Sequence, residues 1–298
     1  MFVSSNRLSD IKSYYQSKLA FLFSENEINL MVKYLTIKRL EIIDVEYINS
    51  SNSLLSESDL LYFNFALKRL LKNEPFQHII GNVEFYGLEL NCDARALIPR
   101  PETEELVDWV FESFDKNSFI EIADLCAGSG CIALALKSKL PNSEIIAAEL
   151  SKDAIALIEE NCIKTNLLVI PMKMDVLIDE GYTDFEANSF DCWVSNPPYI
   201  PHKDKEMMSE NVLDFEPHMA LFVEDNDPLI FYIKLAENAR KYLKNNGLLF
   251  FEIHEDYSQE MLAMLKQKGF VNIELRKDLQ GKARMMRAQN VILSNESE

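Results

Sequence analysis

The 298 residues predict an α/β protein in which a doubly wound sheet follows a small helical bundle. Three observations support this fold class. Apolar residues recur at helical spacing before residue 75, and strand-like and helix-like segments alternate from residue 120 onward. A glycine-rich turn also joins the first strand of that series to its first helix. Ligands of doubly wound sheets bind at the carboxyl ends of the strands, so the functional residues are expected there.

The N-terminal region reads as helices. Apolar residues recur at helical spacing in 11–23, 28–40 and 60–71. Ser56 followed by Asp59 has the pattern of a helix N-cap with an acid in the first turn, and Pro75 ends the region. No residue here has an evident chemical role, so packing is the main interpretation and recognition of a partner the second.

The residue pattern changes from helix-like to strand-like at Phe76. Residues 79–81 and 83–90 predict two short strands around a Gly81-Asn82 turn, so 76–95 is interpreted as a β-hairpin linker. Ile98-Pro99-Arg100-Pro101 then ends the extended segment and a helix starts at Glu102. The predicted domains are an N-terminal helical domain (1–75), for which substrate recognition is the second interpretation, the linker (76–95) and an α/β domain (96–298).

The remaining segments alternate between the two periodicities. The predicted strands are 120–125, 144–150, 167–174, 190–195, 248–253, 271–276 and 285–293. The predicted helices are 131–140, 152–165, 229–243 and 257–268.

The charge distribution bears on the partner. The net charge is −18, from 30 basic and 48 acidic residues. Residues 1–80 contain nine of each sign, so 81–298 contain 21 basic against 39 acidic residues. Such a surface repels phosphate backbones and suits a basic protein partner. The alternative is that the acidity only aids solubility.

Other sequence features exclude several classes of protein. No apolar run approaches the roughly 20 residues that cross a bilayer, and the N-terminal residues lack the pattern of a signal peptide. Five cysteines without a Cys-x-x-Cys pair predict reduced thiols in a cytoplasmic protein. The four histidines lack metal-ligand spacing, so no metal site is expected.

The turn after the first predicted strand is a candidate cofactor loop. It runs from Asp124 to Gly130, and its glycines let the backbone approach a ligand closely. Glu149 ends the next strand, where a carboxylate accepts from a ribose diol, and Asp175 follows the third strand, placed to accept from an adenine amino group. Ala133 stands where a third glycine would seat a pyrophosphate, which leaves NAD or a simple tight turn as alternatives.

A rigid tetrapeptide follows the fourth predicted strand. In Asn196-Pro197-Pro198-Tyr199 the prolines fix φ, so the Asn196 side-chain oxygen and the Pro197 carbonyl can accept from one substrate NH₂ group. Tyr199 adds an aromatic wall for a planar group. An amide nitrogen is a poor nucleophile because its lone pair is delocalised into the carbonyl. Two acceptors on its N–H bonds favour the geometry in which this lone pair can attack the methyl group of a sulfonium. The alternative is an ordinary turn.

At these residues the chain resembles the protein-(glutamine-N5) methyltransferases that modify peptide chain release factors. The resemblance spans nearly the whole chain. Besides the loop and the tetrapeptide, it rests on the following residues: Gln77 to Gly81 with Glu84-Phe85, Leu97 to Glu104, Phe215-Glu216-Pro217 with Ala220-Leu221, Gly247 to Glu252, and Asp278-Leu279 with Gly281 and Arg284.

The resemblance implies a seven-stranded, Rossmann-like class I methyltransferase domain with an N-terminal helical bundle. It implies S-adenosyl-L-methionine as cofactor, S-adenosyl-L-homocysteine as product, and the glutamine of the release-factor Gly-Gly-Gln tripeptide as substrate. The implied cofactor residues are Asp124, Cys126, Ala127, Gly128, Ser129, Gly130, Glu149, Asp175 and Asn196. The implied glutamine-binding residues are Asn196, Pro197, Pro198 and Tyr199, of which Asn196, Pro197 and Tyr199 are the catalytic candidates. A cytoplasmic monomer without direct nucleic-acid or membrane contact is expected.

Two departures from the family pattern concern the cofactor. Cys126 stands where glycine is common, which is tolerable only at negative φ and otherwise costs cofactor fit. Glu149 stands where aspartate is usual. Rival interpretations are a glutamine methyltransferase of a ribosomal protein, an adenine-N6 nucleic-acid methyltransferase, and a non-catalytic cofactor-binding module. Arg100 is a candidate to brace the linker through carboxylates, and residues 215–217 to wall the peptide channel.

Overall fold

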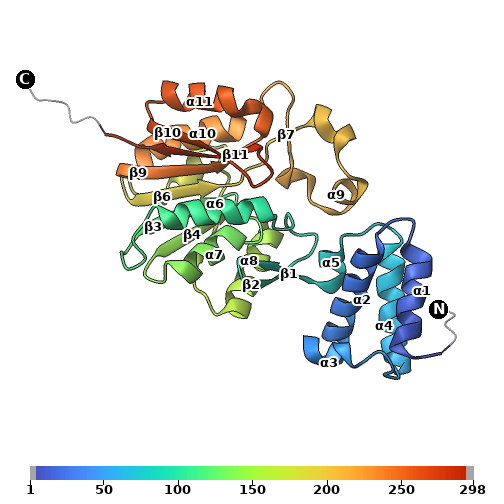
Figure 1. Cartoon of the computed structure of the whole chain (residues 1–298). Coiled ribbons are helices and arrows are strands. Elements are labelled where there is room, and N and C mark those ends of the chain that lie inside the picture. Colours follow the sequence, from blue (N-terminus) through green and yellow to red (C-terminus); the bar gives the residue numbers. More distant parts are fainter. Residues whose placement is uncertain (1–4, 293–298) are drawn as a thin grey trace, which may run out of the picture. The chain divides into compact units, whose positions relative to one another are not determined.

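The computed structural model describes residues 5–292, drawn in Figure 1. These residues form two compact units. One unit comprises 5–82 together with 209–215, and the other comprises 83–208 together with 216–292. Each unit has its own apolar core, so the two are described separately.

The smaller unit is a helical bundle. Its helices are α1 (Leu8–Leu19), α2 (Glu25–Leu40), α3 (Asp44–Ile48), α4 (Glu57–Leu70), α5 (Phe76–Ile80) and α9 (Glu210–Phe215). Ser24 and Ser56 open α2 and α4 with reciprocal capping boxes, so the cap predicted at Ser56 is confirmed. The core residues Tyr15 and Phe63 are fully buried, and the Tyr15 hydroxyl donates to the Phe63 carbonyl.

The prediction of a strand over 79–81 is wrong. Residues Phe76–Ile80 form α5, which begins after Pro75, and Ile79 packs into the core of the bundle. The predicted Gly81-Asn82 turn is also wrong, because the hairpin consists of β1 (Asn82–Phe85) and β2 (Leu88–Asn91) around Tyr86 and Gly87. Both turn residues have positive φ, as a two-residue hairpin turn requires.

The larger unit is built on a seven-stranded sheet, as expected. Its order is β10-β11-β9-β6-β3-β4-β5, and only β11 runs antiparallel to its neighbours. The strands are β3 (Glu121–Leu125), β4 (Glu144–Glu149), β5 (Ile170–Lys173), β6 (Phe190–Ser195), β9 (Leu243–Glu252), β10 (Val271–Lys277) and β11 (Ala283–Gln289). The chain winds from β3 outward to β5 and then returns to β6 beside β3. The strand order therefore reverses between β3 and β6, where doubly wound sheets bind ligands.

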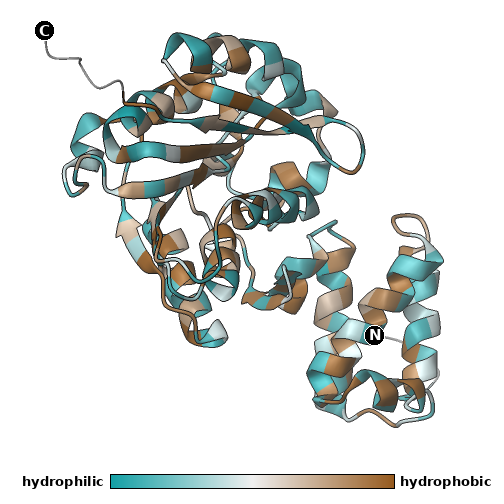
Figure 2. Ribbon diagram, turned by 60° about the vertical axis from the view of Figure 1, so that its left-hand side comes forward, coloured by the Kyte–Doolittle hydropathy of each residue, from teal (hydrophilic) through white to brown (hydrophobic). Residues whose placement is uncertain are grey.

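Helices cover both faces of this sheet (Figure 1). One layer holds α6 (Pro101–Glu112), α7 (Cys131–Lys139) and α8 (Lys152–Thr165), and the other holds α10 (Ile230–Tyr242) and α11 (Ser258–Gln267). Figure 2 colours these helices both teal and brown, as expected for elements with one apolar face against a sheet.

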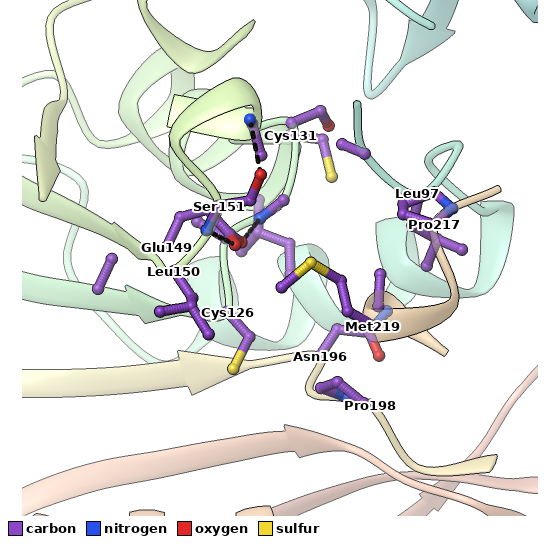
Figure 3. A pocket seen from close by; sticks show the side chains of 18 of the residues that line it. Leu97, Cys126, Cys131, Glu149, Leu150, Ser151, Asn196, Pro198, Pro217 and Met219 are labelled. Atoms are coloured by element: carbon purple, nitrogen blue, oxygen red, sulfur yellow. Dashed lines mark hydrogen bonds between the residues drawn. The ribbon is translucent and has the colours of Figure 1, made fainter. Parts of the chain in front are cut away.

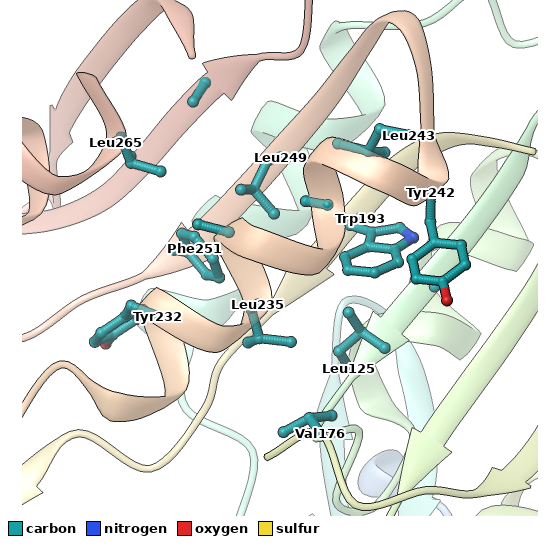
Figure 4. Packing of buried hydrophobic residues seen from close by; sticks show 14 of the residues in the cluster. Leu125, Val176, Trp193, Tyr232, Leu235, Tyr242, Leu243, Leu249, Phe251 and Leu265 are labelled. Atoms are coloured by element: carbon teal, nitrogen blue, oxygen red, sulfur yellow. The ribbon is translucent and has the colours of Figure 1, made fainter. Parts of the chain in front are cut away.

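Successive residues of β6 serve the two cores. Cys192 and Val194 pack with α6 and α7, whereas Trp193 points to the opposite face. There its indole stacks on Tyr242 at 6.0 Å between ring centroids, and Leu235 and Phe251 belong to the same cluster (Figure 4). These contacts fix β6, and therefore the segment that follows it, from both sides.

Most predicted ends of strands and helices lie within a few residues of the observed ones, and 152–165 and 190–195 agree at both ends. The largest strand difference is β9, which starts at Leu243 rather than at 248. At this end of β9, Leu243 pairs with Phe190 of β6, and the Lys244 ammonium reaches Asp191 on β6 and Glu121 on β3. The predicted end of the last strand, residue 293, lies outside the described residues.

A second small sheet lies beyond β6. Strand β7 (Ile200–Pro201) pairs in parallel with β8 (Phe222–Val223), with Ile200 opposite Phe222. This pairing ties the residues after the Asn-Pro-Pro-Tyr segment to those after residue 220, although about 20 residues separate them in sequence.

Candidate functional site

Two of the predicted motifs meet at the reversal of strand order. Leu125 at the end of β3 lies opposite Ser195 at the end of β6, and the Ser195 hydroxyl donates to the Leu125 carbonyl. The glycine loop and Asn196 leave the sheet from these two adjacent strand ends. The cofactor loop and the tetrapeptide therefore lie next to each other at this edge of the sheet.

A cavity opens above these strand ends. Its volume is about 950 Å³, a figure that includes space open to solvent. Several predicted site residues line it: Cys126, Ala127, Gly128, Ser129, Glu149, Asp175, Asn196 and Pro198. In Figure 3, Glu149 and Cys126 lie to one side of Asn196, with Leu97 and Pro217 to the other.

Four predicted site residues are absent from the cavity lining that the described residues provide. These are Asp124, Gly130, Pro197 and Tyr199. Asp124 is fully buried beneath the loop, and Gly130 has φ of +77° and lies so close to Ile158 that a Cβ would sit 3.1 Å from its methyl carbon. Their placement indicates support of the loop from below.

The cavity also has lining residues that were not predicted to bind a ligand. Leu97, Pro99 and Arg100 come from the segment before α6, and Pro217, Met219 and Ala220 from the segment before β8. The remaining lining residues are Arg95, Ala96, Thr103, Cys131, Ile132, Ala148, Leu150, Ser151, Ala154, Met174, Val176 and Phe231. The Pro99-Arg100-Pro101 and Glu216-Pro217 motifs are the sequence features that could have identified the segments before α6 and before β8 as cavity walls.

The backbone of the glycine loop is left-handed at three points. Gly128 has φ of +56°, where the ideal Cβ position would have only the Ala96 methyl nearby, at 3.9 Å. Cys126 also has positive φ, at +64°. The sequence analysis expected a cysteine to be tolerable here only at negative φ, and the structure does not meet that expectation. A non-glycine residue in this conformation costs about 1 kcal/mol or more. Burial raises the pKa of its thiol, and the Glu149 charge raises it further.

Glu149 is held in place by backbone donors. One carboxylate oxygen accepts from Gly128 N–H at 2.8 Å and the other from Ser151 N–H at 2.9 Å (Figure 3). The carboxylate thus connects the end of β4 to the glycine loop and retains lone pairs for a ligand hydroxyl. Asp175 follows β5 and accepts from Leu177 N–H at 2.9 Å. Two carboxylates at consecutive strand ends in one cavity suit the polar edges of a nucleoside.

Asp124 is electrostatically unusual. One of its oxygens accepts from Ala133 N–H at 3.1 Å, and the other has no hydrogen-bond partner among residues 5–292. Burial raises the pKa of this carboxyl to about 7. The hydrogen bond from Ala133 N–H lowers the pKa, and the Glu149 charge raises it by a smaller amount. A buried acid below the first turn of α7 is therefore poised to change charge near neutral pH.

Asn196 lies at one end of a hydrogen-bond chain that runs through Thr103 and Glu252 to Tyr199. Its side-chain Nδ2 donates to Thr103 Oγ1 at 3.4 Å, and Thr103 donates to Glu252 Oε2 at 2.6 Å. The other oxygen of Glu252 accepts from the Tyr199 hydroxyl at 3.0 Å. Burial raises the pKa of Glu252, whereas the two hydroxyl donors and the Arg284 charge oppose that rise.

Glu216 connects two walls of the cavity. Its carboxylate accepts from Ile98 N–H at 3.0 Å and from Arg100 Nη2 at 2.6 Å, and its side chain is fully buried. The expected bracing by Arg100 thus has a carboxylate partner in the structure. Nearby, Glu104 accepts from Tyr86 N–H at 2.7 Å and so attaches the hairpin turn to α6.

No three His, Cys, Asp or Glu side chains of the described residues gather as a metal site would need. Between residues 5 and 292, no helix combines the length and the apolar character needed to span a membrane. All five cysteines lie in the described part of the chain as free thiols.

Comparison with known proteins matches a family model described as "Methyltransferase small domain" to residues 107–215. The chain is 35% identical over 283 residues to the release factor glutamine methyltransferase of Flavobacterium psychrophilum, which covers 94% of this chain and 98% of that protein. It is 34% identical to the protein of the same name from Bacteroides thetaiotaomicron, over 94% of this chain and 99% of the relative.

Solved structures support the fold. A METTL16 methyltransferase domain superposes with a TM-score of 0.52 at 18% identity, covering 70% of this chain and 91% of that one. A methyltransferase from Pyrococcus furiosus gives a TM-score of 0.50 at 16% identity, covering 69% and 90%. At these identities the likeness establishes the class I methyltransferase sheet and nothing about substrate.

Proposed function

The chain belongs to the release factor glutamine methyltransferases, and from this membership we propose that it transfers a methyl group from S-adenosylmethionine to the N5 amide nitrogen of a release-factor glutamine. The substrate glutamine is that of the Gly-Gly-Gln tripeptide. The observation that carries the proposal is the placement of Asn196, at the tip of β6, in the same cavity as the glycine loop and Glu149.

The cofactor fits the side of the cavity formed by the ends of β3, β4 and β5. Gly128 and Ser129 allow close approach of the ligand, Glu149 accepts from the ribose hydroxyls, and Asp175 accepts from the adenine amino group. Asp124 and Gly130 hold the loop from below, and Asn196 borders the reacting end. When bound, S-adenosylmethionine supplies an electrophilic methyl group on a sulfonium.

The chain's own contribution to the reaction is to hold the substrate amide. Asn196 Oδ1 and the Pro197 carbonyl each accept one N–H of the glutamine side chain, and the prolines keep the two acceptors rigid. Pro198 lines the cavity beside Asn196, and Tyr199, which lies outside the lining, supports this segment through its hydrogen bond to Glu252. With both N–H bonds held, the nitrogen lone pair is directed at the methyl carbon. Methyl transfer would form a nitrogen–carbon bond as the sulfur–carbon bond broke, and the nitrogen would then lose one proton to solvent.

The test is mass spectrometry of a purified release factor incubated with the protein and S-adenosylmethionine. We expect one added methyl group that maps to the Gly-Gly-Gln glutamine. Asn196→Ala is expected to lower the rate constant at least hundredfold, because it deletes one acceptor at the reacting nitrogen. Its dissociation constant for the cofactor, measured by calorimetry, is expected to change less than about threefold.

Parallel reactions with ribosomal proteins and with DNA distinguish the rival interpretations. Transfer only to a ribosomal protein would retain the chemistry and change the partner. Transfer to adenine in DNA would overturn the assignment of a protein amide. Wild-type turnover by Asn196→Ala would contradict the assigned role of the side chain.

A further inference from the structure

Thr103 contributes a buried hydroxyl whose purpose the proposed reaction leaves open. It lies in the first turn of α6, is 2% exposed, and contacts two other elements through its Oγ1. One contact reaches Glu252 at the end of β9, and the other reaches Asn196 beyond the end of β6. The hydroxyl therefore bridges a buried carboxyl and the amide that faces the cavity.

The direction of these hydrogen bonds follows from the donors available. A hydroxyl has one hydrogen, and the carboxylate form of Glu252 can only accept. Both Glu252 oxygens are engaged by hydroxyls, Oε2 by Thr103 at 2.6 Å and Oε1 by Tyr199 at 3.0 Å. The single hydrogen of Thr103 is thereby committed to Glu252, so its lone pairs must accept from the third partner.

That third partner is the Asn196 amide. The two ends of an amide differ only in that nitrogen donates and oxygen accepts, so the neighbours decide which end faces where. A lone pair of Thr103 selects the nitrogen end, at 3.4 Å, and leaves Oδ1 for the cavity. The flipped amide would bring two acceptors together at Thr103 and present an NH₂ group to a substrate NH₂ group.

Arg284 opposes the rise that burial causes in the pKa of Glu252, as do the two hydroxyl donors. Its guanidinium belongs to the electrostatic surroundings of both Glu252 and Tyr199, and its Nε donates to the buried carboxylate of Asp278 at 3.3 Å. Strand pairing places it beside the end of β9, since Ile253 N–H donates to the Arg284 carbonyl at 2.8 Å. A cation here stabilises Glu252 as an acceptor of two hydroxyl hydrogens.

We propose that Thr103, oriented by Glu252, is a positioning residue that holds the Asn196 amide with its oxygen toward the substrate glutamine. The inference rests on the proposed function and adds to it the residue that sets the polarity of the substrate-binding amide. Thr103 acts through Asn196 and transfers no proton itself.

The test compares three variants by single-turnover methyl transfer to a release factor. Thr103→Val removes the hydroxyl at nearly constant shape, whereas Thr103→Ser keeps the hydroxyl and loses a methyl group. Thr103→Val is expected to lower the rate constant about tenfold, the effect of one hydrogen bond, and Thr103→Ser less than threefold. Thr36→Val is the matched control, because Thr36 also buries a hydroxyl, which donates to the Val32 carbonyl within α2. Its rate constant is expected to equal that of the wild type.

Two further readouts separate positioning from general loss of structure. The dissociation constant for S-adenosylmethionine is expected to be unchanged in Thr103→Val and Thr103→Ser alike. In an Asn196→Ala background, Thr103→Val should cause no additional loss, since the group it orients is already gone. If Thr103→Val folds poorly, Thr103→Ala removes the same hydroxyl without a branched replacement and must show the same tenfold loss.

The outcomes distinguish this inference from the function on which it rests. No methyl transfer by the wild type overturns both. Transfer by the wild type with equal losses in Thr103→Val and Thr103→Ser, or wild-type turnover by Thr103→Val, overturns the positioning role alone. Losses that add up in the double variant do the same.

Discussion

Glu149 combines two tasks in one side chain. Its carboxylate accepts from the backbone of Gly128 and Ser151, and it faces the cavity in which a ribose is proposed to lie. Its side chain is long enough to reach the glycine loop from the end of β4. A single substitution should therefore disturb both the loop and the ligand.

Glu149→Ala is expected to raise the dissociation constant for S-adenosylmethionine about 10- to 100-fold, because two to three hydrogen bonds are lost. Calorimetry measures this directly. Glu144→Ala is the matched control, since Glu144 lies at the opposite, exposed end of the same strand. An unchanged constant for Glu149→Ala would show that the ribose assignment is wrong.

Asp124 gives the fold a dependence on pH. Its pKa is raised to about 7 by burial, above the ordinary value of 3.8, so the folded protein binds this proton more tightly than the unfolded chain. The stability contributed by the neutral carboxyl is present below pH 4 and is lost as the pH rises through about 7. Asp124→Asn has a neutral side chain at every pH. Its free energy of unfolding minus that of the wild type should therefore increase across this window, by at most about 1.4 kcal/mol per pH unit.

Urea denaturation without cofactor at several pH values checks this expectation. Trp109 and Trp193 are the only tryptophans, and both lie in the cores of the larger unit, so their fluorescence reports that unit alone. Asp184→Asn corrects for the loss of a charge, because Asp184 is exposed. A difference between Asp124→Asn and wild type that stays constant from pH 4 to pH 8 would contradict the raised pKa.

Among the elements, the segment before α6 and the segment before β8 depend on one carboxylate. Glu216 pairs with Arg100 and Ile98 N–H, and residues of both segments line the cavity. The carboxylate is fully buried, whereas the Arg100 side chain is 34% exposed, so part of the pair's energy is screened by solvent.

Glu216→Ala is expected to lower the free energy of unfolding of the larger unit by about 1–3 kcal/mol, because it leaves a guanidinium and a backbone N–H without their acceptor. Tryptophan fluorescence in urea measures the loss. Glu237→Ala, which breaks an exposed ion pair with Lys268, should cost less than about 1 kcal/mol. Equal effects in the two variants would show that Glu216 acts as an ordinary surface charge.

At the scale of the whole molecule, the charge is the main feature. The excess of acidic residues lies entirely after residue 80, and the part of the chain that carries it includes the cavity at the strand ends. Complementary charge speeds association and is screened by salt, whereas the chemical step inside a cavity responds less.

The KM for the release factor is therefore expected to rise about three- to tenfold between 50 and 300 mM salt, with kcat nearly constant. Steady-state kinetics at fixed pH measures both, and the cofactor's dissociation constant at the same salt concentrations is the control. A KM that falls or stays constant as salt increases would show that the acidic surface serves solubility alone.

Local pattern alone was sufficient where one periodicity dominates. Residues 152–165 and 190–195 were predicted to the residue, because amphipathic spacing and an unbroken apolar run decide those elements locally. It failed at Ile79 and Ile80, whose β-branched side chains suit a strand but are buried in a short helix against the bundle. It also missed the start of β9, where Lys244 forms ion pairs with residues more than 50 positions away.

For the candidate site as well, some features could be predicted from local sequence and others could not. The sequence by itself determined the fold class and the motifs at the strand ends, because these rest on periodicity and on short segments of fixed conformation. Only the tertiary structure decided that Cys126 has a positive φ, that Asp124 and Tyr199 lie behind the cavity wall, and that Thr103 links Asn196 to Glu252. The two hydrogen bonds of Thr103 join residues 93 and 149 positions apart, and a buried hydrogen bond leaves no local pattern in a sequence.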